Sequence, residues 1–186
     1  LAARCMKEIF LPTLAALKAE GRPFHGVLYF GLMLTPDGPK VVEYNARFGD
    51  PECQAVLSLL DSDLMEIFLA CRSGTLDQVE VRWKDAAACC LVLASGGYPG
   101  SYGKGYPITG LEEAGRTAVV FHAGTRLAGG ELVTAGGRVL GVTAVAETLL
   151  AAVKDAYAAA DHIHFEGMHK RSDIGARALH AAQGGN

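Results

Sequence analysis

The hydrophobic residues in the first part of the chain recur every three or four positions, which is the spacing of amphipathic helices. One helix is predicted from Met6 to about Gly21, with a kink or a restart at Pro12, which cannot donate the helical hydrogen bond. Another is predicted from Ser62, as its N-cap, to Gly74, as its C-terminal stop. The apolar side chains expected in the core are Met6, Ile9, Phe10, Leu14 and Leu17 on the first helix and Leu64, Ile67, Phe68 and Cys71 on the second.

Between these helices the pattern predicts a β-hairpin. Residues 24–34 are almost all apolar and include β-branched and aromatic side chains, which indicates a strand buried on both faces. Thr35-Pro36-Asp37-Gly38 is typical of a turn, and residues 40–48 alternate between apolar and polar side chains. The side chains expected to pack from this second strand are Val42, Tyr44, Ala46 and Phe48. A short helix is expected after Pro51.

After about residue 80, short apolar runs alternate with glycine-rich turns, which is typical of a small antiparallel sheet or a barrel-like unit. Thr143 precedes a stretch with helical spacing that reaches Ala160, so one helix is expected to pack on this sheet. The predicted strands are residues 86–94, 117–125, 132–142 and 163–165. The fold class is therefore α+β, with a first domain at residues 1–80 and a second at residues 81–183.

The composition is that of a globular protein and excludes several classes of partner. Half of the 186 residues are hydrophobic and the net charge is −3, so no strong attraction to nucleic acid or to an anionic membrane is expected. The five cysteines include the adjacent Cys89 and Cys90 but no Cys-x-x-Cys spacing, which favours reduced thiols in a cytoplasmic protein. The start, from Leu1 to Glu8, lacks an initiator methionine and has the character of a helix interior, so a fragment of a longer protein is expected.

The strand at residues 40–48 carries candidate chemistry on its polar face. Because side chains alternate along a strand, Glu43, Asn45 and Arg47 are expected to stand in a row, about 6.6 Å apart. Carboxylate and carboxamide oxygens suit Mg²⁺, which takes few protein ligands and keeps its other positions for phosphate and water. The guanidinium of Arg47 can hold a further phosphate or carboxylate. The same pattern also fits the solvated outer face of an antiparallel strand.

The residues that follow this strand favour the binding interpretation. Gly49 ends the strand, Asp50 occupies the expected N-cap position and Pro51 suits the first position of a helix. A helix N-terminus with free N–H groups would then lie beside the polar row, where it could bind an anion.

Three other groups of residues carry weaker signals. The glycine-rich stretch at residues 95–105 lacks the spacing of a phosphate-binding loop and does not open a helix, so a structural loop is favoured. His25, at the start of the first strand, is interpreted as a surface residue rather than a catalytic base. Arg171, Asp173 and Arg177 either approach an anionic substrate or form an ion-paired terminal helix.

The segment Glu-Tyr-Asn-Ala-Arg-Phe-Gly-Asp-Pro-Glu, which starts at Glu43, resembles the signature of the phosphoribosylamine–glycine ligase (glycinamide ribonucleotide synthetase) family of ATP-grasp enzymes. ATP-grasp carboxylases share its Glu-x-Asn-x-Arg triplet but not the Phe-Gly-Asp-Pro-Glu continuation. Other segments similar to this family are Gly-Gly-Tyr-Pro-Gly-x-Tyr-x-Lys-Gly from Gly96, His-Ala-Gly-Thr from His122 and Gly-Gly-Arg-Val-Leu-x-Val-Thr-Ala from Gly136. Arg-Ser-Asp-Ile-Gly from Arg171 is similar to a family Arg-Lys-Asp-Ile-Gly element, with Ser172 in place of the lysine. The resemblance runs from about Phe24 to Leu179 and covers the later half of the family's enzyme.

This resemblance implies the C-terminal part of an ATP-grasp domain, followed by the family's mostly antiparallel C-terminal domain. It implies a ligase of de novo purine biosynthesis that uses ATP to join glycine to 5-phosphoribosylamine through a glycyl phosphate. Glu43 and Asn45 would bind Mg²⁺ or Mn²⁺, and Arg47 would be the catalytic group that stabilises the transferred phosphate. The residues implied to bind substrate are Asp50, Pro51, Arg171 and Asp173.

The implied partners are ATP, glycine, 5-phosphoribosylamine and the missing N-terminal half of the same enzyme, which would carry the lid over ATP. Without that half the chain alone is expected to be inactive. Two alternatives stay open: an ATP-grasp carboxylase, which shares the polar row, and a non-catalytic module that only binds or assembles. The absence of a biotin-attachment motif and the Phe-Gly-Asp-Pro-Glu segment speak against the carboxylase.

Overall fold

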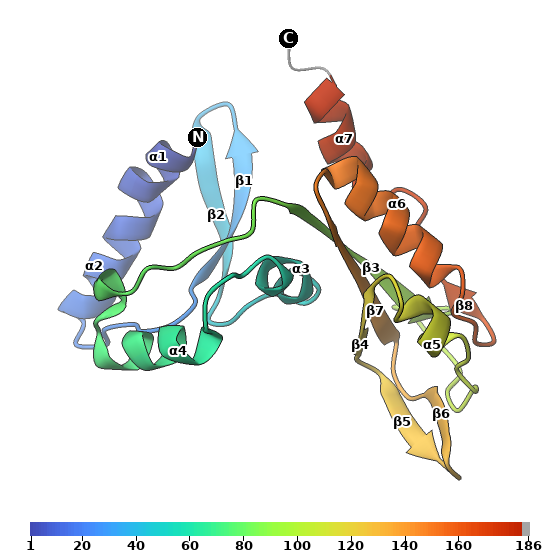
Figure 1. Ribbon diagram of the computed structural model, residues 1–186. Coiled ribbons are helices and arrows are strands. Elements are labelled where there is room, and N and C mark those ends of the chain that lie inside the picture. Colours follow the sequence, from blue (N-terminus) through green and yellow to red (C-terminus); the bar gives the residue numbers. More distant parts are fainter. Residues whose placement is uncertain (184–186) are drawn as a thin grey trace. The chain divides into compact units, whose positions relative to one another are not determined.

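The protein, seen in a computed structural model that describes residues 1–183, folds into two compact units (Figure 1). The first unit contains Leu1–Gly49 and Ser62–Arg82, and the second contains Asp50–Asp61 and residues 83–183. Both combine helices with antiparallel strand pairs, so the predicted α+β class is confirmed. The domain division at residue 80 stays a prediction, and the compact units differ from it because they interleave along the chain.

The first unit begins with a helical segment that changes its geometry just before Pro12. It runs through α1 (Ala2–Cys5), the π-helical turn η1 (Met6–Phe10) and α2 (Leu11–Ala19). Proline has no N–H and its ring crowds the carbonyl four residues earlier, so the wider π turn lets Pro12 enter the first turn of α2. The segment ends before Gly21, which has a φ of 73°. The predicted restart at Pro12 and the predicted end near Gly21 are both confirmed.

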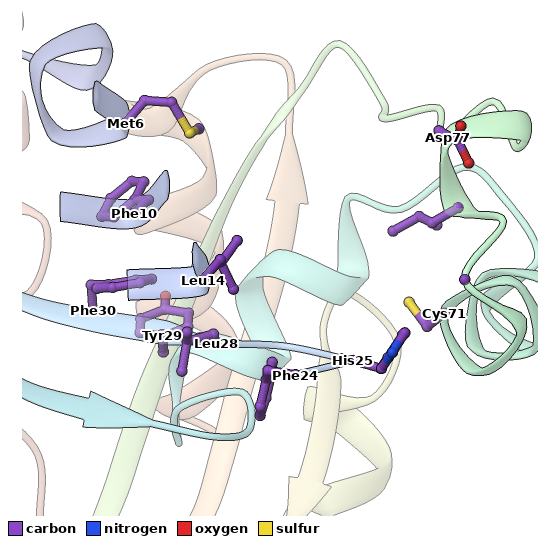
Figure 2. A pocket seen from close by; sticks show the side chains of 13 residues that line it. Met6, Phe10, Leu14, Phe24, His25, Leu28, Tyr29, Phe30, Cys71 and Asp77 are labelled. Atoms are coloured by element: carbon purple, nitrogen blue, oxygen red, sulfur yellow. The ribbon is translucent and has the colours of Figure 1, made fainter. Parts of the chain in front are cut away.

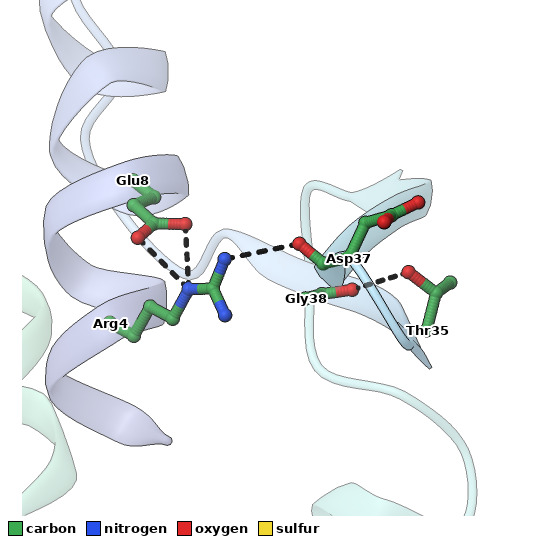
Figure 3. A network of polar contacts seen from close by, with 5 residues as sticks. All are labelled: Arg4, Glu8, Thr35, Asp37 and Gly38. Carbon is green, nitrogen blue, oxygen red and sulfur yellow. Dashed lines mark hydrogen bonds and ion pairs between the residues drawn. The ribbon is translucent and has the colours of Figure 1, made fainter.

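β1 (Tyr29–Thr35) and β2 (Gly38–Asn45) form the predicted antiparallel hairpin. Arg4 of the first helix is hydrogen-bonded to the turn of this hairpin, because its Nη2 donates to the carbonyl oxygen of Asp37 at 3.1 Å (Figure 3). The Arg4 Nε donates to both carboxylate oxygens of Glu8 at 2.9 Å. Within the turn, the Thr35 hydroxyl donates to the carbonyl oxygen of Gly38 at 2.8 Å. These contacts fix the turn against α1.

The hairpin contains a β-bulge that the alternation of apolar and polar side chains does not predict. Gly31 of β1 pairs with Glu43 of β2. The next residue of β1 pairs with Val41, so Val42 is an extra residue on β2. A bulge reverses the side-chain alternation on its far side. Val41 and Tyr44 accordingly line the same pocket, although simple alternation places them on opposite faces.

The first unit is completed by α4 (Leu64–Ser73) and the 3₁₀ turn η2 (Leu76–Gln78). Asp63, and not the predicted Ser62, is the N-cap of α4, because its carboxylate accepts a hydrogen bond from the backbone N–H of Met65 at 2.7 Å. The Ser62 hydroxyl accepts from the backbone N–H of Arg82 at 2.8 Å instead. Gly74, with a φ of 72°, ends α4 as predicted.

The first unit has a small core and a largely apolar surface. Among the described residues, its buried hydrophobic side chains are those of Cys5, Ile9 and Ala70. The prediction of burial is wrong for several side chains, which are exposed: Met6, Leu14, Met33, Leu34, Val42, Tyr44 and Phe68. The physical reason is that a two-stranded sheet with a few helices presents more apolar surface than it can cover.

The second unit is built on a four-stranded antiparallel sheet with the order β4-β7-β3-β8. Its strands are β3 (Ala87–Ser95), β4 (Val119–His122), β7 (Arg138–Ala146) and β8 (Met168–His169). A separate hairpin joins β5 (Thr125–Ala128) to β6 (Glu131–Thr134). The helices are α3 (Glu52–Ser58), α5 (Leu111–Ala114), α6 (Leu149–Ala160) and α7 (Ala176–Gln183). Because α3 and α6 both contact β3 and β7, the predicted small antiparallel domain with a packed helix is confirmed.

The core of the second unit is formed by the two central strands and α6. Its fully buried strand residues include Leu91, Leu93, Val139 and Val142, and its buried helix residues include Ala152, Ala156, Ala159 and Ala160. The alanines give α6 a flat face, so the helix can lie close to the sheet. The second unit therefore has the continuous hydrophobic core that the first unit lacks.

We expect Leu91→Ala to lower the free energy of unfolding of the second unit by about 2–5 kcal/mol, the range for truncating a large buried aliphatic side chain. Leu91 is 0% exposed on β3, so the vacated volume stays a cavity. The measurement is urea unfolding of the purified chain, followed by circular dichroism. The matched control, Leu127→Ala on β5, removes a side chain that is 73% exposed. A similar loss in both variants would contradict the assigned core.

Two predicted boundaries in the second unit are wrong. Thr143 does not precede the helix but lies buried inside β7, and the N-cap of α6 is Thr148, whose hydroxyl accepts from the N–H of Ala151 at 3.2 Å. Residues 163–165 form only an isolated bridge rather than a strand. Both errors arise because a buried stretch with alternating or continuous apolar residues does not mark where one element ends.

The glycine-rich stretch after β3 folds into a loop in which chain segments approach closely. A Cβ on Gly96 would lie 2.6 Å from the carbonyl oxygen of Gly167, and a Cβ on Gly137 would overlap the ring of Tyr98. The next helix, α5, begins only at Leu111. Close packing, and not phosphate binding, therefore explains the glycines at these two positions.

The cysteines and the helices carry no sign of a disulfide or of a membrane span within the part of the chain that the structure describes. All five cysteines are free thiols. Burial raises the pKa of Cys89 and that of Cys90, which keeps both thiols protonated at neutral pH. Across residues 1–183, no helix combines the length and the apolar character that crossing a bilayer requires.

Candidate functional site

Glu43 and Asn45 lie side by side at the end of β2. The Asn45 Nδ2 donates a hydrogen bond to the Glu43 Oε1 at 3.1 Å. The two residues are two positions apart beyond the bulge, so regular alternation places both side chains on one face of the hairpin. Glu43 is exposed and Asn45 is partly buried. The structure thus brings the two predicted metal ligands within hydrogen-bonding distance of each other.

Arg47 does not continue this row along the strand. β2 ends at Asn45, and the backbone bends at Ala46 and Arg47. The Arg47 Nη1 donates to the carbonyl oxygen of Phe48 at 3.1 Å, and its side chain is exposed. The expected spacing of about 6.6 Å along one strand therefore does not extend to Arg47. Its catalytic role stays a prediction.

Asp50 and Pro51 are displaced by one position from their predicted roles. Pro51 is the N-cap of α3, and among residues 1–183 no side chain caps this helix. The Asp50 carboxylate is instead paired with Arg138, whose Nη2 lies 3.0 Å from Oδ2, and accepts from the Gln54 Nε2 at 2.8 Å. The Arg138 Nη1 also donates to the Asp50 carbonyl oxygen at 3.0 Å. The predicted N-cap role of Asp50 is wrong because its carboxylate is used in these contacts.

Sequence reasoning missed Arg138 and Gln54 as partners of Asp50. Arg138 begins β7, 88 positions after Asp50, and no spacing rule links residues so far apart. The available signal was the place of Arg138 in the Gly-Gly-Arg-Val segment. Gln54 lies one helical turn after Asp50, a spacing at which side chains meet. Arg138 and Gln54 hold the Asp50 carboxylate in one orientation. Anion binding at the N-terminus of the seven-residue α3 stays a prediction.

Arg171 and Asp173 form an ion pair with each other on the surface. The Arg171 Nε and Nη2 donate to the two carboxylate oxygens of Asp173 at 2.8 and 2.7 Å. The hydrogen bond from Arg171 lowers the pKa of the Asp173 carboxyl. The Tyr157 hydroxyl fixes the same loop, because it donates to the Arg171 carbonyl oxygen at 2.7 Å and accepts from the N–H of Ile174 at 3.1 Å. The ion pairing of the predicted alternative is therefore present, but in the loop before α7 rather than on the terminal helix, and a substrate contact stays a prediction.

A pocket of about 760 Å³ in the first unit is lined mainly by apolar side chains (Figure 2). Its lining includes Met6, Phe10, Leu14, Phe24, Leu28, Tyr29, Phe30 and Leu76. The rings of Phe10 and Phe30 lie 4.4 Å apart between centroids. His25 and Asp77 also line it, and the His25 side chain is exposed, as the surface interpretation predicts. The lining of this pocket is thus mainly apolar surface and not a cluster of polar or reactive side chains.

Glu43 and Asn45 fit a cation that takes few protein ligands. Within residues 1–183, no group of three or more His, Cys, Asp or Glu side chains could hold a metal ion. Since the Asn45 amide nitrogen donates to Glu43, the Asn45 Oδ1 is left as the second oxygen atom that could ligate a cation. Mg²⁺ is commonly bound by one or two carboxylates together with substrate phosphates. The pair therefore suits a hard divalent cation that is held jointly with a phosphate group.

Two protein-family models match the chain, one in each half. Residues 1–53 match "Phosphoribosylglycinamide synthetase, ATP-grasp (A) domain". Residues 88–177 match "Phosphoribosylglycinamide synthetase, C domain". The first match contains Glu43, Asn45, Arg47 and Asp50, and the second contains Arg138.

Curated relatives are similar over nearly the whole chain. A phosphoribosylamine–glycine ligase from Agrobacterium fabrum is 51% identical over 95% of this chain and 42% of its own length. The ligase of that name from Caulobacter vibrioides is 52% identical over 93% of this chain and 41% of its own length. The crystal structure of phosphoribosylamine–glycine ligase from Thermotoga maritima is 37% identical, with a TM-score of 0.82, over 92% of this chain and 42% of that one.

The chain thus spans less than half the length of these relatives. The ATP-grasp match ends just after the Glu43–Asn45 pair, and the C-domain match begins with the central strand β3. The motifs, the order of the two matches and the fold agree. The chain belongs to the phosphoribosylamine–glycine ligase family.

Proposed function

We propose that this chain is part of an ATP-dependent ligase that joins glycine to 5-phosphoribosylamine in de novo purine biosynthesis. The observation that carries the proposal is the Glu43–Asn45 pair, in which the Asn45 Nδ2 lies 3.1 Å from the Glu43 Oε1. The pair lies on a strand within the residues that match the ATP-grasp domain model. The relatives that share this strand are named phosphoribosylamine–glycine ligases. The Phe-Gly-Asp-Pro-Glu segment that follows the pair supports the same family over the carboxylases.

The proposed chemistry is phosphoryl transfer from ATP to the glycine carboxylate. The resulting glycyl phosphate is attacked by the amine of 5-phosphoribosylamine, which forms the amide bond and releases phosphate. Such a transfer depends on positioning and on charge neutralisation. A divalent cation, Mg²⁺ or Mn²⁺, would neutralise phosphate charge when bound by Glu43 and Asn45. Arg47 would stabilise the charge of the transferred phosphoryl group with its fork of N–H donors.

The remaining candidate residues are proposed to bind substrate. Asp50 and Pro51 would bind substrate through their backbone groups, because the Asp50 carboxylate is already paired with Arg138. Arg138 also fixes this backbone, since it donates a hydrogen bond to the Asp50 carbonyl oxygen. Arg171 and Asp173 would contact an anionic substrate only after their exposed ion pair opens. The proposed partners are ATP, glycine, 5-phosphoribosylamine and the N-terminal segment that the longer relatives contain. The proposed location is the cytoplasm, where purine precursors are made.

The decisive experiment is a turnover assay on the full-length protein that contains this chain. We expect ADP release that requires glycine and 5-phosphoribosylamine together, with the glycine amide of phosphoribosylamine as the product. ADP release with bicarbonate in place of glycine would favour the carboxylase. If nucleotide stabilises the protein against heat but no product forms, the protein would instead be a binding module.

Arg47→Lys is expected to lower kcat/KM of the full-length ligase by a factor that corresponds to about 1–3 kcal/mol, as for a lost hydrogen bond to a charged group. Lysine keeps the positive charge but lacks the forked geometry. Steady-state kinetics with varied glycine provides the measurement. Arg47→Met serves as the folding control, because the exposed Arg47 side chain should be dispensable for stability. Full activity of Arg47→Lys would show that guanidinium geometry is irrelevant here.

A further inference from the structure

The side chain of Glu43 lies directly over Gly31 on the neighbouring strand. The two residues are paired across the hairpin. A Cβ placed on Gly31 would lie 2.7 Å from the Glu43 Cγ, closer than side-chain carbons approach one another. The Glu43 side chain therefore occupies space that is available only because residue 31 has no side chain.

Space, and not backbone conformation, accounts for glycine at this position. Many glycines of the chain have positive φ angles that other residues rarely adopt, but Gly31 is not among them. In the interior of a strand, glycine is otherwise unfavourable compared with residues that can pack. Glycine thus makes the strand less stable at the position that faces the Glu43 side chain.

Two further features act on the same carboxylate. The extra residue Val42 immediately precedes Glu43, and bulges of this kind turn the adjacent side chains away from the regular strand direction. On the other side, the Asn45 amide holds the Glu43 Oε1 at 3.1 Å. The carboxylate is therefore set by the bulge, by the free space over Gly31 and by the Asn45 amide.

We propose that Gly31 is a positioning residue for the divalent cation, because it lets the Glu43 carboxylate lie across β1 next to Asn45. This inference rests on the proposed role of Glu43 as a metal ligand. In Gly31→Ala, the nearest backbone atom of Glu43, its carbonyl oxygen, would be 3.6 Å from the new methyl group, which is an ordinary contact. The backbone can therefore stay in place while the Glu43 side chain moves to another rotamer. The carboxylate would leave Asn45 and the two ligands would separate.

The test measures Mn²⁺ binding to the full-length ligase in the presence of a non-hydrolysable ATP analogue, by electron paramagnetic resonance. We expect Gly31→Ala to raise the Kd for Mn²⁺ about 10-fold, the lower end of the effect seen for residues that orient metal ligands. Met33→Ala, which truncates a side chain that is 58% exposed on the same strand, should bind Mn²⁺ as the wild type does. Both variants should keep the wild-type unfolding midpoint.

A double-mutant cycle with Glu43→Ala separates positioning from a general effect on the strand. Glu43→Ala has no Cγ and no carboxylate, so adding Gly31→Ala to it should change neither folding nor Mn²⁺ binding further. If Gly31→Ala alone misfolds but the double variant folds, the contact with the Glu43 side chain is still demonstrated, and misfolding of both would refute the proposal. Wild-type Mn²⁺ affinity in Gly31→Ala would refute the role of Gly31 alone. Wild-type affinity in Glu43→Ala would refute the metal site itself.

Discussion

Glu43→Gln in the full-length ligase is expected to lower kcat on the order of 10²-fold, the effect of removing one preorganised polar group from a charge-stabilising site. Glutamine keeps the shape of the side chain and can still accept the hydrogen bond from the Asn45 Nδ2. It removes one negative charge from the pair that is proposed to hold the cation. Because the affinity for the cation falls, raising the Mg²⁺ concentration should restore part of the lost rate.

The measurement for Glu43→Gln is kcat at a series of Mg²⁺ concentrations, with saturating ATP, glycine and 5-phosphoribosylamine. Glu66→Gln is the matched control, because it neutralises another exposed carboxylate of the same unit, on α4. The unfolding midpoint should be unchanged in both variants, since neither side chain is buried. Wild-type turnover of Glu43→Gln at low Mg²⁺ would assign Glu43 to the solvated surface of the hairpin.

The local part of the candidate site could be predicted from the sequence. Glu43 and Asn45 share a face because a strand repeats every two residues, and this rule needs no knowledge of the rest of the fold. The turn at residues 35–38 and the end of α4 at Gly74 follow in the same way from residue-specific backbone preferences. Each of these features depends on residues that are close together in the chain.

The bulge at Val42 could not be predicted in this way. An extra residue on one strand leaves no mark in the alternation of apolar and polar side chains, because the residues on each side of Val42 still alternate among themselves. Val41 and Tyr44 consequently line one pocket that alternation alone divides. The proposed role of Gly31 could not be predicted either, because it depends on which residue of β2 pairs with Gly31.

Contacts between distant segments were also beyond the sequence patterns. The predicted N-cap role of Asp50 was reasonable locally, since aspartate before proline commonly starts a helix. Arg138, from the start of β7, contributes both an ion pair and a backbone hydrogen bond to the same residue. Tertiary contacts thus decided the orientation of the Asp50 carboxylate. The Asp50 carboxylate is therefore engaged within the second unit and is not free to cap α3.

By itself, the 186-residue chain is expected to catalyse no ligation and to be unequally stable along its length. The Glu43–Asn45 pair is open to water, and a site that does not exclude water exposes an acyl phosphate to hydrolysis. The relatives are more than twice as long, so other parts of a ligase would be needed to close the site. An assay of the purified chain for ADP release with glycine and 5-phosphoribosylamine tests the first expectation.

The difference in stability should be large, because the two units differ in what they bury. The second unit has a continuous core that includes Leu91 and Ile163, both 0% exposed. In the described part of the chain, the first unit buries few apolar side chains, and no further strand pairs with either outer edge of its two-stranded sheet. Amides in β3 and β7 should therefore exchange only through global unfolding of the second unit. Those in β1 and β2 should exchange about 10³-fold faster or more, through local opening that needs little free energy.

Hydrogen exchange followed by mass spectrometry, with peptides that cover β1–β2 and β3–β7, measures this difference directly. Leu91→Ala provides an internal check, because it should speed exchange in β3 and β7 while leaving β1 and β2 unchanged if the two units open independently. Turnover of the isolated chain at the rate of an intact ligase would contradict the need for further segments. Equal protection of the two hairpin strands and the two core strands would contradict the expected weakness of the first unit, which rests on its few buried side chains.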